Sequence, residues 1–597
     1  MVSKFLFIVS KFLPYWSFPR PVQDNLTLSP QGGSLVLYQR MTYGAVLASL
    51  LAAGDSLAVD RTVVSTNGMV VAGHPLASES GMKALRAGGT ACDAAVTTAA
   101  TLSVMMPDMM GPGGSGFALL WDEKKKDLSA IDYNGVAPKK IDASKYTMEK
   151  KLRGFWAPTV PANLKGWEEV HKKCGKLKWA DLWADAIDYA ATGRPIDWDS
   201  AFHTRRYVSE LGIYEGWAKE FLIDGKAPEQ GQRLIRTDLA NTYRQFARQG
   251  SKALYGGPVG DKLVAYMQKN GGLISREDLL AYKVVWRKPV HMVYRGYSVY
   301  GAPPPSSAIT WMEMLSVLQE YDLKALKHNS FEYLNTMVEV SKHAYMDSYR
   351  YVSDPAFVSI PIDKLLSQEY AVEVRQRIER GRFDMRTIKQ AMLDLPPKTA
   401  TSHMSVVDRW GNAVSMTNTL GTFWGAGVVI EGTGILLSNG MDWFDIDENV
   451  WTGEKPGNLA MAPGKRNRWT LAPGMLFKDG KLTMVVGGAG AESTMYGIAQ
   501  PIVNIVDFGM DAFAAISAPR VLWGDTNHYT GGTEVHLQPG ISEEIRAKMK
   551  AIGHNVPDIG KNRNSAAGTT NLIVVDPVSR TYSGAAARNG RDYVSGY

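Results

Sequence analysis

The chain has 597 residues, of which 45% are hydrophobic and 21% are charged, and its formal net charge is +7 at neutral pH. A chain of this length and apolar content can bury a sizeable core. Its charge is modest for the size, and acidic residues flank the densest basic run, residues 124–126, which indicates a solvated turn and excludes an extended nucleic-acid-binding stripe.

No Pro/Ser-rich linker or regular repeat divides the chain, so we expect one globule. The two cysteines, Cys92 and Cys174, lie in segments of different character. We therefore expect no disulfide framework, and neither cysteine has neighbours in a metal-ligand pattern. Cys92 is predicted to be a small buried residue of a helix, and neither a metal ion nor a cofactor is predicted.

Residues 1–61 are predicted to be an N-terminal extension, and residues 38–58 have the features of a secretion signal. Arg40 precedes a short apolar stretch over 41–54, and small residues follow where a signal peptidase cuts. With a signal the protein would be periplasmic or secreted; the alternative is a disordered extension on a cytoplasmic protein. No stretch is long and apolar enough to span a bilayer.

Hydrophobic spacing then predicts elements in chain order. Residues 78–88 have helical spacing, and Thr90 and Asp93 open an alanine-rich helix over 91–104. Strands are predicted on both sides of the charged turn, followed by three stretches of helical spacing: 117–121 and 128–133 for the strands, and 167–191, 330–351 and 369–395 for the helical stretches, the last ending in a polar connector.

Gly111, Gly113 and Gly116 formally match the glycine fingerprint of dinucleotide-binding folds. That fingerprint requires a strand before the glycines and a helix after them, whereas residues 117–121 are strand-like. We therefore predict a tight turn packed near an active site, and no nucleotide.

From residue 401 onward the apolar residues recur with a period of two, which predicts a hairpin. Thr401 stands at the head of this alternation, after a polar stretch that contains prolines. A threonine hydroxyl is a poor nucleophile without a base, and a freed α-amino group on the same residue, with a pKa of about 7.7–8.0, supplies one. Thr401 is thus a candidate nucleophile exposed by self-cleavage; the alternative is an ordinary strand residue.

Several motifs, in this order along the chain, resemble the γ-glutamyltransferase family. In the C-terminal part they are TSHMSVVDRWGNAVSMTNTL from Thr401 and GILLSN from Gly434; in the N-terminal part they are residues 73–78, 87–95, 111–117 and 130–133. The resemblance runs from about residue 67 to residue 597.

This resemblance implies an α+β fold, the four-layer αββα sandwich of the N-terminal-nucleophile hydrolases. It also implies a precursor that cleaves itself between Ala400 and Thr401. The products would be a large subunit of residues 62–400 and a small subunit of residues 401–597, which stay together as a heterodimer. A dimer of such heterodimers is a further expectation.

The same resemblance implies the catalytic groups. Thr401 would be the nucleophile, and Thr419 would be the second threonine whose hydroxyl bonds to it. Backbone N–H groups of Gly490 and Ala491 would bind the oxyanion of the tetrahedral intermediate. The family has a glycine pair in this loop, so the Cβ of Ala491 would be strained in a left-handed backbone.

The residues that would bind a γ-glutamyl group depart from the family pattern. Asn134 stands in place of an arginine that would hold the α-carboxylate. The other altered positions, where the family has an asparagine, an amide, a second acid and a serine pair, are Gly421, Gly440, Trp443, Trp469 and Thr470. Trp443 and Trp469, with Trp424 as a further candidate, offer aromatic surface in place of charges. Arg466 and Arg468 are candidates to meet a carboxylate or are exposed loop charges.

These residues predict an amidohydrolase or acylase that works through a threonine acyl-enzyme, with an acyl group that is not γ-glutamyl. A buried polar site that has lost its partners rejects its former substrate strongly, by a factor of roughly 10⁴. One alternative is a γ-glutamyl transpeptidase or glutathione hydrolase with a rearranged clamp, and another is an inactive binding or scaffold homologue. The predicted partners are a small amide and the two subunits of one precursor, without nucleic acid.

Overall fold

The computed structural model describes residues 62–381, 400–447, 453–524, 534–557, 568–586 and 592–597. The chain divides into a unit of residues 1–60 and a unit of residues 61–597, and the description below concerns the second unit. The signal-like segment 38–58 and the connector before Ala400 lie outside the described residues.

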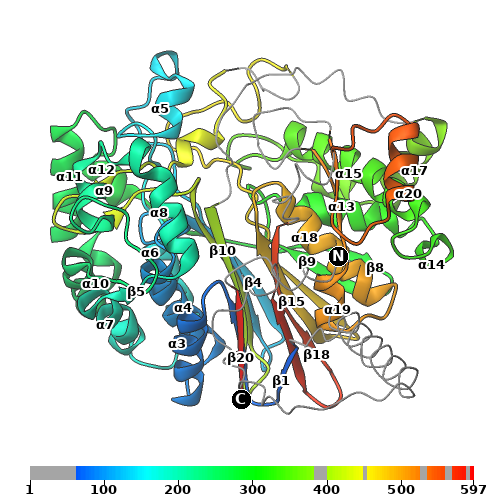
Figure 1. Cartoon of the computed structure of the whole chain (residues 1–597), viewed down its shortest axis with the longest axis horizontal. Coiled ribbons are helices and arrows are strands. Elements are labelled where there is room, and N and C mark those ends of the chain that lie inside the picture. Colours follow the sequence, from blue (N-terminus) through cyan, green and yellow to red (C-terminus); the bar gives the residue numbers. More distant parts are fainter. Residues whose placement is uncertain (1–61, 382–399, 448–452, 525–533, 558–567, 587–591) are drawn as a thin grey trace, which may run out of the picture. The chain divides into compact units, whose positions relative to one another are not determined.

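Two seven-stranded sheets form the centre of this unit (Figure 1). In the first sheet, every neighbouring pair is antiparallel, and the order is β20 (Tyr593–Gly596), β2 (Met69–Ala72), β10 (Ala400–Val407), β11 (Ala413–Gly421), β3 (Ser115–Asp122), β4 (Asp127–Tyr133) and β7 (Val285–Arg287). In the second sheet the order is β1 (Val63–Ser65), β19 (Tyr582–Ala586), β18 (Thr569–Val575), β15 (Lys481–Ala489), β14 (Gly474–Lys478), β9 (Tyr297–Gly301) and β8 (Val290–Tyr294).

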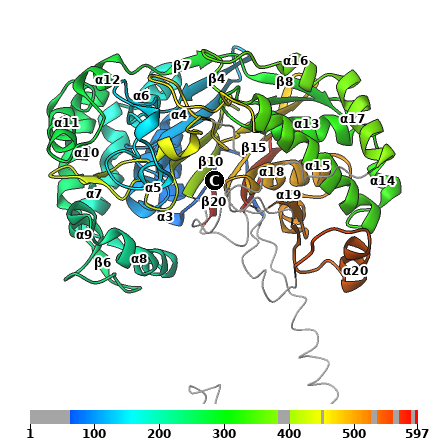
Figure 2. The ribbon, with the colours of Figure 1, turned by 90° about the horizontal axis from the view of Figure 1, so that it is seen from above.

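Helices cover the outer face of each sheet, as both ribbon views show (Figures 1 and 2). On the first sheet lie α3 (Pro75–Arg86), α4 (Ala91–Met105) and α6 (Asn163–Cys174), with α7 (Ala184–Thr192), α8 (Trp198–Leu211), α9 (Glu215–Phe221), α10 (Thr237–Gln249), α11 (Pro258–Lys269) and α12 (Arg276–Ala281) around them. On the second sheet lie α13 (Ala308–Leu318), α15 (Phe331–Tyr351), α18 (Ser493–Val506) and α19 (Ala512–Ser517), with α14 (Leu323–Leu326), α17 (Gln368–Arg380) and α20 (Glu543–Ala551) nearby.

Three apolar layers hold the four structural layers together. The middle layer lies between the two sheets and contains Val71 and Leu119 from the first sheet and Val485 and Ile573 from the second. The other two layers lie between each sheet and its helices. This arrangement confirms the predicted α+β sandwich, because each sheet buries both of its faces.

The predicted elements near the N-terminus are confirmed, with two corrections. Thr90 and Asp93 form a capping box at the start of α4, as their spacing predicts. The helical stretch 167–191 is broken after Cys174 into α6 and α7. The expectation of no disulfide is wrong: Cys92 and Cys174 are bonded, with their Cα atoms 5.8 Å apart. The two segments are 82 residues apart, and only the packing of α6 on α4 brings them together.

The hairpin that begins at Thr401 sets the orientation of the reactive residues. Met404 and Val406 pack toward the helices, whereas Val407 packs between the sheets. Side chains alternate along a strand, so Thr401 and His403 share the face that looks toward the second sheet. No helix in the described ranges is long and apolar enough to cross a membrane, and no metal-binding cluster of acids, histidines and cysteines occurs there.

Candidate active site

Thr401 lies beside Thr419 in the uncut chain. The two residues face each other across β10 and β11, and the Thr401 hydroxyl donates a hydrogen bond to Thr419 Oγ1 at 3.1 Å. Thr419 Oγ1 in turn donates to the carbonyl oxygen of Ala400 and accepts from the Gly421 N–H at 2.8 Å. The predicted nucleophile and the carbonyl of the predicted cleavage bond are therefore both in contact with one hydroxyl.

A bulge marks the same peptide bond. Ala400 pairs with Gly421 and Thr401 pairs with Thr419, so Leu420 is an extra residue on β11 at this point. Gly421 has a φ of +105°, a backbone region that favours glycine. Bulges re-aim side chains and interrupt ladder pairing, and this one sets Ala400 and Thr401 apart from the regular hairpin below them.

The glycine run at residues 111–116 supports this geometry. A Cβ on Gly114 would collide with the carbonyl oxygen of Thr419, and a Cβ on Gly113 would collide with the carbonyl oxygen of Leu436. The run is thus a turn packed against the strand that carries Thr419, and β3 follows it directly.

His403 is a structural neighbour that stays neutral. Its ring bonds to Thr417 Oγ1 at 2.8 Å and to Ser405 Oγ at 3.1 Å, and a Cβ on Gly487 would collide with it. Burial lowers the pKa of His403 from 6.5 to about 3. The imidazole therefore fills the space between the sheets below Thr401, and its depressed pKa leaves the free amine of Thr401 as the expected base.

The loop after β15 contains both residues that are predicted to bind the oxyanion. Gly490 has a φ of +138° and Ala491 a φ of +51°, so the Cβ of Ala491 stands on a left-handed backbone, which favours glycine. Both carbonyl groups are used within the loop, because Gly490 O accepts from Ser493 and Ala491 O accepts from Thr494. In the described part of the chain neither N–H donates to another protein group, which leaves both available for a ligand.

Three of the residues that depart from the family pattern lie together in the buried interior. Trp469 Nε1 donates to Asn134 Oδ1 at 2.6 Å, and Asn134 Nδ2 donates to Asn467 O at 2.6 Å. The rings of Trp443 and Trp469 lie 4.8 Å apart. Six residues form this apolar cluster, which we call the tryptophan cluster: Phe117, Ala302, Trp443, Trp469, Leu471 and Ala491. It includes one of the two predicted oxyanion residues, so it adjoins the oxyanion loop.

The remaining altered positions differ in where they lie. A Cβ on Gly421 would collide with Asn439 Oδ1 and lie 3.3 Å from the Trp469 ring, so Gly421 borders the tryptophan cluster. A Cβ on Gly440 would collide with Thr159, and Thr470 is buried beside Trp469.

The Trp424 assignment requires a correction. Trp424 does not belong to the tryptophan cluster, because it packs against Trp217 at 5.3 Å and against Phe221 at 4.6 Å in a separate apolar group.

Both candidate arginines are already paired with acidic side chains of the protein. Arg468 is buried and donates to Glu492 Oε1 at 2.6 Å, and Arg466 lies 3.6 Å from Asp132. Arg468 is therefore not an exposed loop charge. It ties the segment that carries Trp469 to the residue that follows Ala491.

Asp442, the acid that this chain keeps, has a basic neighbour. Lys151 is buried, which lowers the pKa of its ammonium group, and the charges of Asp442 and Asp445 raise it. Lys151 Nζ also donates to the carbonyl oxygen of Phe444. The Asp442 carboxylate thus already faces a cation of the protein itself, an arrangement that the sequence pattern did not reveal.

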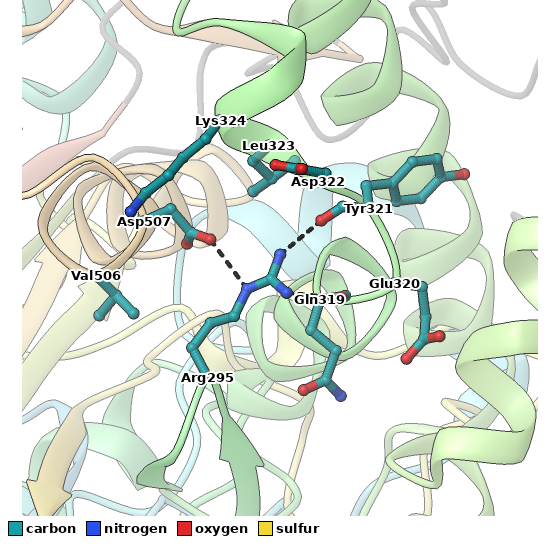
Figure 3. A pocket seen from close by; sticks show the side chains of 9 residues that line it. All are labelled: Arg295, Gln319, Glu320, Tyr321, Asp322, Leu323, Lys324, Val506 and Asp507. Atoms are coloured by element: carbon teal, nitrogen blue, oxygen red, sulfur yellow. Dashed lines mark hydrogen bonds and ion pairs between the residues drawn. The ribbon is translucent and has the colours of Figure 1, made fainter.

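A surface hollow of about 580 Å³ lies far from these residues, at the turn between β8 and β9 (Figure 3). Arg295 crosses it and donates to Asp507 at 3.0 Å and to the Tyr321 carbonyl oxygen at 2.6 Å. Ala302 of the tryptophan cluster follows the other end of β9, so the hollow and the cluster lie at opposite ends of this strand.

Comparisons with known proteins identify the family of the chain and several relatives. The sequence model of the gamma-glutamyltranspeptidase family matches residues 77–597. The chain belongs to this family. Its members are hydrolases and transferases with an N-terminal nucleophile, and the related proteins are made as proenzymes.

Relatives of two kinds are similar over most of their length. The glutathione hydrolase-like YwrD proenzyme of Bacillus subtilis is 34% identical over 535 residues, covering 89% of this chain and 98% of the relative. The acylase ACY 1 proenzyme of a Pseudomonas species is 34% identical over 536 residues, covering 87% and 92%. Among solved structures, the cephalosporin acylase of Bacillus halodurans has a TM-score of 0.81 at 27% identity, covering 98% of this chain and 99% of that chain.

Proposed function

We propose that the chain is a self-processing amidohydrolase whose nucleophile is Thr401 and whose acyl substrate lacks the α-amino acid head of a γ-glutamyl group. The observation that carries the first part is the position of Thr419 between the Thr401 hydroxyl and the Ala400 carbonyl oxygen. A donor aimed at the carbonyl under attack stabilises the negative charge that develops there.

In self-cleavage, Thr401 Oγ attacks the carbonyl carbon of Ala400, and the Thr419 hydroxyl donates to the resulting oxyanion. The C–N bond then breaks, the nitrogen takes up the proton that the attacking Thr401 hydroxyl has lost, and an ester links Ala400 to Thr401 Oγ. Water hydrolyses this ester and releases the Ala400 carboxylate and the free amine of Thr401. The same threonine now carries a hydroxyl and an adjacent base.

In turnover, the Thr401 amine takes the hydroxyl proton while Oγ attacks the substrate amide carbon. The N–H groups of Gly490 and Ala491 donate to the oxyanion, a contribution that is typically worth about 3–4 kcal/mol for each preorganised donor. The amine half of the substrate takes up this proton from the Thr401 amine and leaves. Water then hydrolyses the acyl-enzyme. His403 takes no part, because burial holds its pKa at about 3.

The tryptophan cluster supports the second part of the proposal. Where an α-carboxylate would need a cation, Asn134 and Trp469 satisfy each other with a neutral hydrogen bond. The neighbouring arginines are paired with Glu492 and Asp132. A zwitterionic head would lose its water there without gaining partners, whereas an aromatic or aliphatic acyl group would lose little. The similarity to an acylase and to a cephalosporin acylase is in line with this preference.

The processing proposal is tested on a denaturing gel and by intact mass. Wild type should separate into a fragment that ends at Ala400 and one of residues 401–597, and Thr401→Ala should remain one chain. A new N-terminus other than Thr401, or an active enzyme without cleavage, would exclude this nucleophile. A wild type that neither cleaves nor turns over any amide would identify an inactive homologue.

The acyl preference is tested by kcat/KM for a panel of anilides that share one leaving amine and differ in the acyl group. We expect phenylacetyl and other uncharged acyl groups to exceed γ-glutamyl by roughly 10⁴ or more, because several polar contacts are absent. The similarity to a glutathione hydrolase-like protein supports the rival assignment. If the γ-glutamyl anilide is the best substrate, the enzyme is a γ-glutamyltransferase or glutathione hydrolase with a rearranged clamp.

We also propose that the protein is exported. The disulfide between Cys92 and Cys174 supports this, because disulfides persist in oxidising compartments and are rare in the cytosol. Alkylation of the protein as isolated from its own cells should find no free thiol until a reductant is added, and its N-terminus should lie beyond residue 58. Two free thiols on a chain that retains residues 1–61 would instead indicate a cytoplasmic protein.

A further inference from the structure

We propose that Ser493 is a positioning residue of the candidate active site, because it holds the carbonyl group of the peptide whose N–H group, on Ala491, binds the oxyanion during turnover. The inference rests on the proposed amidohydrolase function. It deepens that function by naming the side chain that sets the direction of one oxyanion donor, a residue that no sequence motif marked.

Two contacts between the sheets show which residues of β15 face the reactive strand. The Ser405 hydroxyl of β10 lies 3.5 Å from the Val485 carbonyl oxygen of β15. Two residues nearer to Thr401, the His403 ring packs against Gly487, where an added Cβ would lie 2.1 Å from the ring. A step of two residues along β10 toward Thr401 therefore matches a step of two residues along β15 toward its C-terminal end.

The same step places Thr401 across from Ala489, the last residue of β15. Gly490 and Ala491 follow it directly. Packed sheets lie about 10 Å apart. The Thr401 side chain, an acyl carbon bonded to its Oγ, the oxyanion and one hydrogen bond together span roughly 8 Å. An oxyanion formed on Thr401 is therefore within reach of the start of this loop.

Ser493 fixes the direction of the peptide between Gly490 and Ala491. The Gly490 carbonyl oxygen accepts from the Ser493 N–H at 3.1 Å and from the buried Ser493 hydroxyl at 2.6 Å. The C=O and N–H groups of one trans peptide point in opposite directions. Because this carbonyl is held toward the start of α18, on the outer face of the second sheet, the Ala491 N–H points away from α18, toward the inner face that Thr401 occupies (Figure 1).

Ala491 makes this arrangement easy to disturb. It is the second residue of a β-turn closed by the bond from Ser493 N–H, and its φ of +51° is a value that alanine disfavours. Rotation of the Gly490–Ala491 peptide by half a turn would bring this φ to about −130°, which alanine adopts easily. The Gly490 carbonyl oxygen would then face the oxyanion and repel it. The two bonds from Ser493 oppose this rotation.

Other contacts hold the far end of the turn. Arg468 donates to Glu492 Oε1 at 2.6 Å, and the Tyr345 hydroxyl donates to the Glu492 carbonyl oxygen. Neither contact involves the peptide that carries the donor. Within the described ranges, only Ser493 contributes a side chain to the Gly490 carbonyl oxygen. Arg468 and Tyr345 thus fix the place of the turn, whereas Ser493 fixes the direction of the N–H group.

The test compares self-cleavage and turnover in Ser493→Ala. With an anilide substrate, kcat should fall by about tenfold and KM should change less than twofold, because one hydrogen bond that holds the donor is lost and the binding surface is kept. Self-cleavage should keep the wild-type rate, because Thr419 donates to the Ala400 carbonyl oxygen in that step. Ser493→Thr keeps the hydroxyl and should restore kcat.

A second background separates orientation of the peptide from other effects of the substitution. Glycine adopts a positive φ without penalty, so Ala491→Gly should keep the N–H in its direction even with one bond fewer. Ser493→Ala should then lower kcat only about twofold relative to Ala491→Gly alone. An effect of Ser493→Ala that does not act through this peptide would be equally large in both backgrounds.

Thr570→Val is the matched control. Thr570 Oγ1 is buried, donates to the Gly497 carbonyl oxygen of α18 at 2.6 Å and accepts from Arg520 at 3.2 Å. The substitution removes a bond of the same length about one helical turn beyond Ser493. It should lower the free energy of unfolding and leave kcat within twofold of wild type.

Three results would overturn the role of Ser493: an unchanged kcat in Ser493→Ala, equal slowing of self-cleavage and turnover, or equal losses in the two backgrounds. If Ser493→Ala does not fold, Ser493→Cys replaces it, because a thiol of similar size is only a weak donor and the same difference between cleavage and turnover is expected.

Failure of the proposed function is distinguishable, because it is seen in wild type before any variant is made. A wild type that turns over no amide would refute both proposals. If γ-glutamyl anilide is the best substrate, only the acyl preference fails, and the Ser493 comparison is made with that anilide.

Discussion

Thr419→Val removes one hydroxyl from the centre of the candidate active site and keeps the β-branched shape. The wild-type hydroxyl donates to the Ala400 carbonyl oxygen and accepts from Thr401 Oγ1 and from the Gly421 N–H. Thr419 is fully buried, so no solvent replaces these partners. The substitution therefore leaves a buried carbonyl and a buried N–H without the group that satisfied them.

The magnitudes for stability and for rate differ. Each of the two unsatisfied buried groups costs about 1–3 kcal/mol, so the free energy of unfolding should fall by about 2–6 kcal/mol. Loss of a donor to the carbonyl under attack typically lowers a rate by about 10²–10³. A folded chain of this size tolerates that loss of stability. The loss of rate should be visible as a slower appearance of the two subunits. We expect self-cleavage to slow by about 10²-fold.

The assay is a time course of intact mass after rapid purification, with unfolding in urea measured on the same samples. Thr417→Val is the matched control, because Thr417 Oγ1 is also buried and bonds to His403 at 2.8 Å, on the same face of β11 but away from the cleavage bond. The control should lose stability and cleave at close to the wild-type rate. If both variants slow equally, or if Thr419→Val cleaves normally, the hydroxyl of Thr419 does not assist cleavage.

Three further predictions concern packing and charge. Gly421→Ala should block cleavage and lower expression of folded protein, because its Cβ would collide with Asn439 Oδ1 on a φ of +105°; normal cleavage by intact mass would contradict this. Arg468→Met should lower the free energy of unfolding in urea by about 3–5 kcal/mol, since it leaves the buried Glu492 carboxylate without its cation, and adding Glu492→Leu should recover part of the loss; an unchanged urea midpoint would contradict it. His403 has a pKa of about 3 in the folded state against 6.5 ordinarily. Its contribution to stability should therefore be complete above pH 6.5, and the free energy of unfolding should fall by up to about 1.4 kcal/mol per pH unit as the pH drops toward 3. A plot of that free energy against pH should be less steep for His403→Gln than for wild type, and equal slopes would refute the assignment.

The parts of the fold that depend on local sequence could be predicted. The capping box of Thr90 and Asp93 and the alternation after Thr401 involve residues within a few positions of each other, and both are present in the structure. The four layers followed from the family resemblance. The break of the helical stretch after Cys174 could not be predicted, because periodicity alone does not show where a chain turns.

The contacts that define the candidate site could not be predicted, because they join distant segments. Asn134 and Trp469 are 335 residues apart, and the family pattern marked each as altered without showing that they bond to each other. Arg468 and Glu492 likewise satisfy each other only because two loops meet beside the oxyanion donors. Resemblance identifies positions, whereas burial and partners come from tertiary packing.

These contacts change what would be needed to restore γ-glutamyl recognition. Asn134→Arg together with Trp443→Asp would supply a cation and an acid, yet the change removes the acceptor of Trp469 Nε1 and leaves that buried indole N–H without a partner. Adding Trp469→Ser removes the stranded donor and opens space for a bidentate Arg–carboxylate pair. We therefore expect the triple variant, measured by kcat/KM for γ-glutamyl anilide, to exceed the double variant. A double variant that is as active as the triple would mean that Trp469 does not border the space where the α-carboxylate binds.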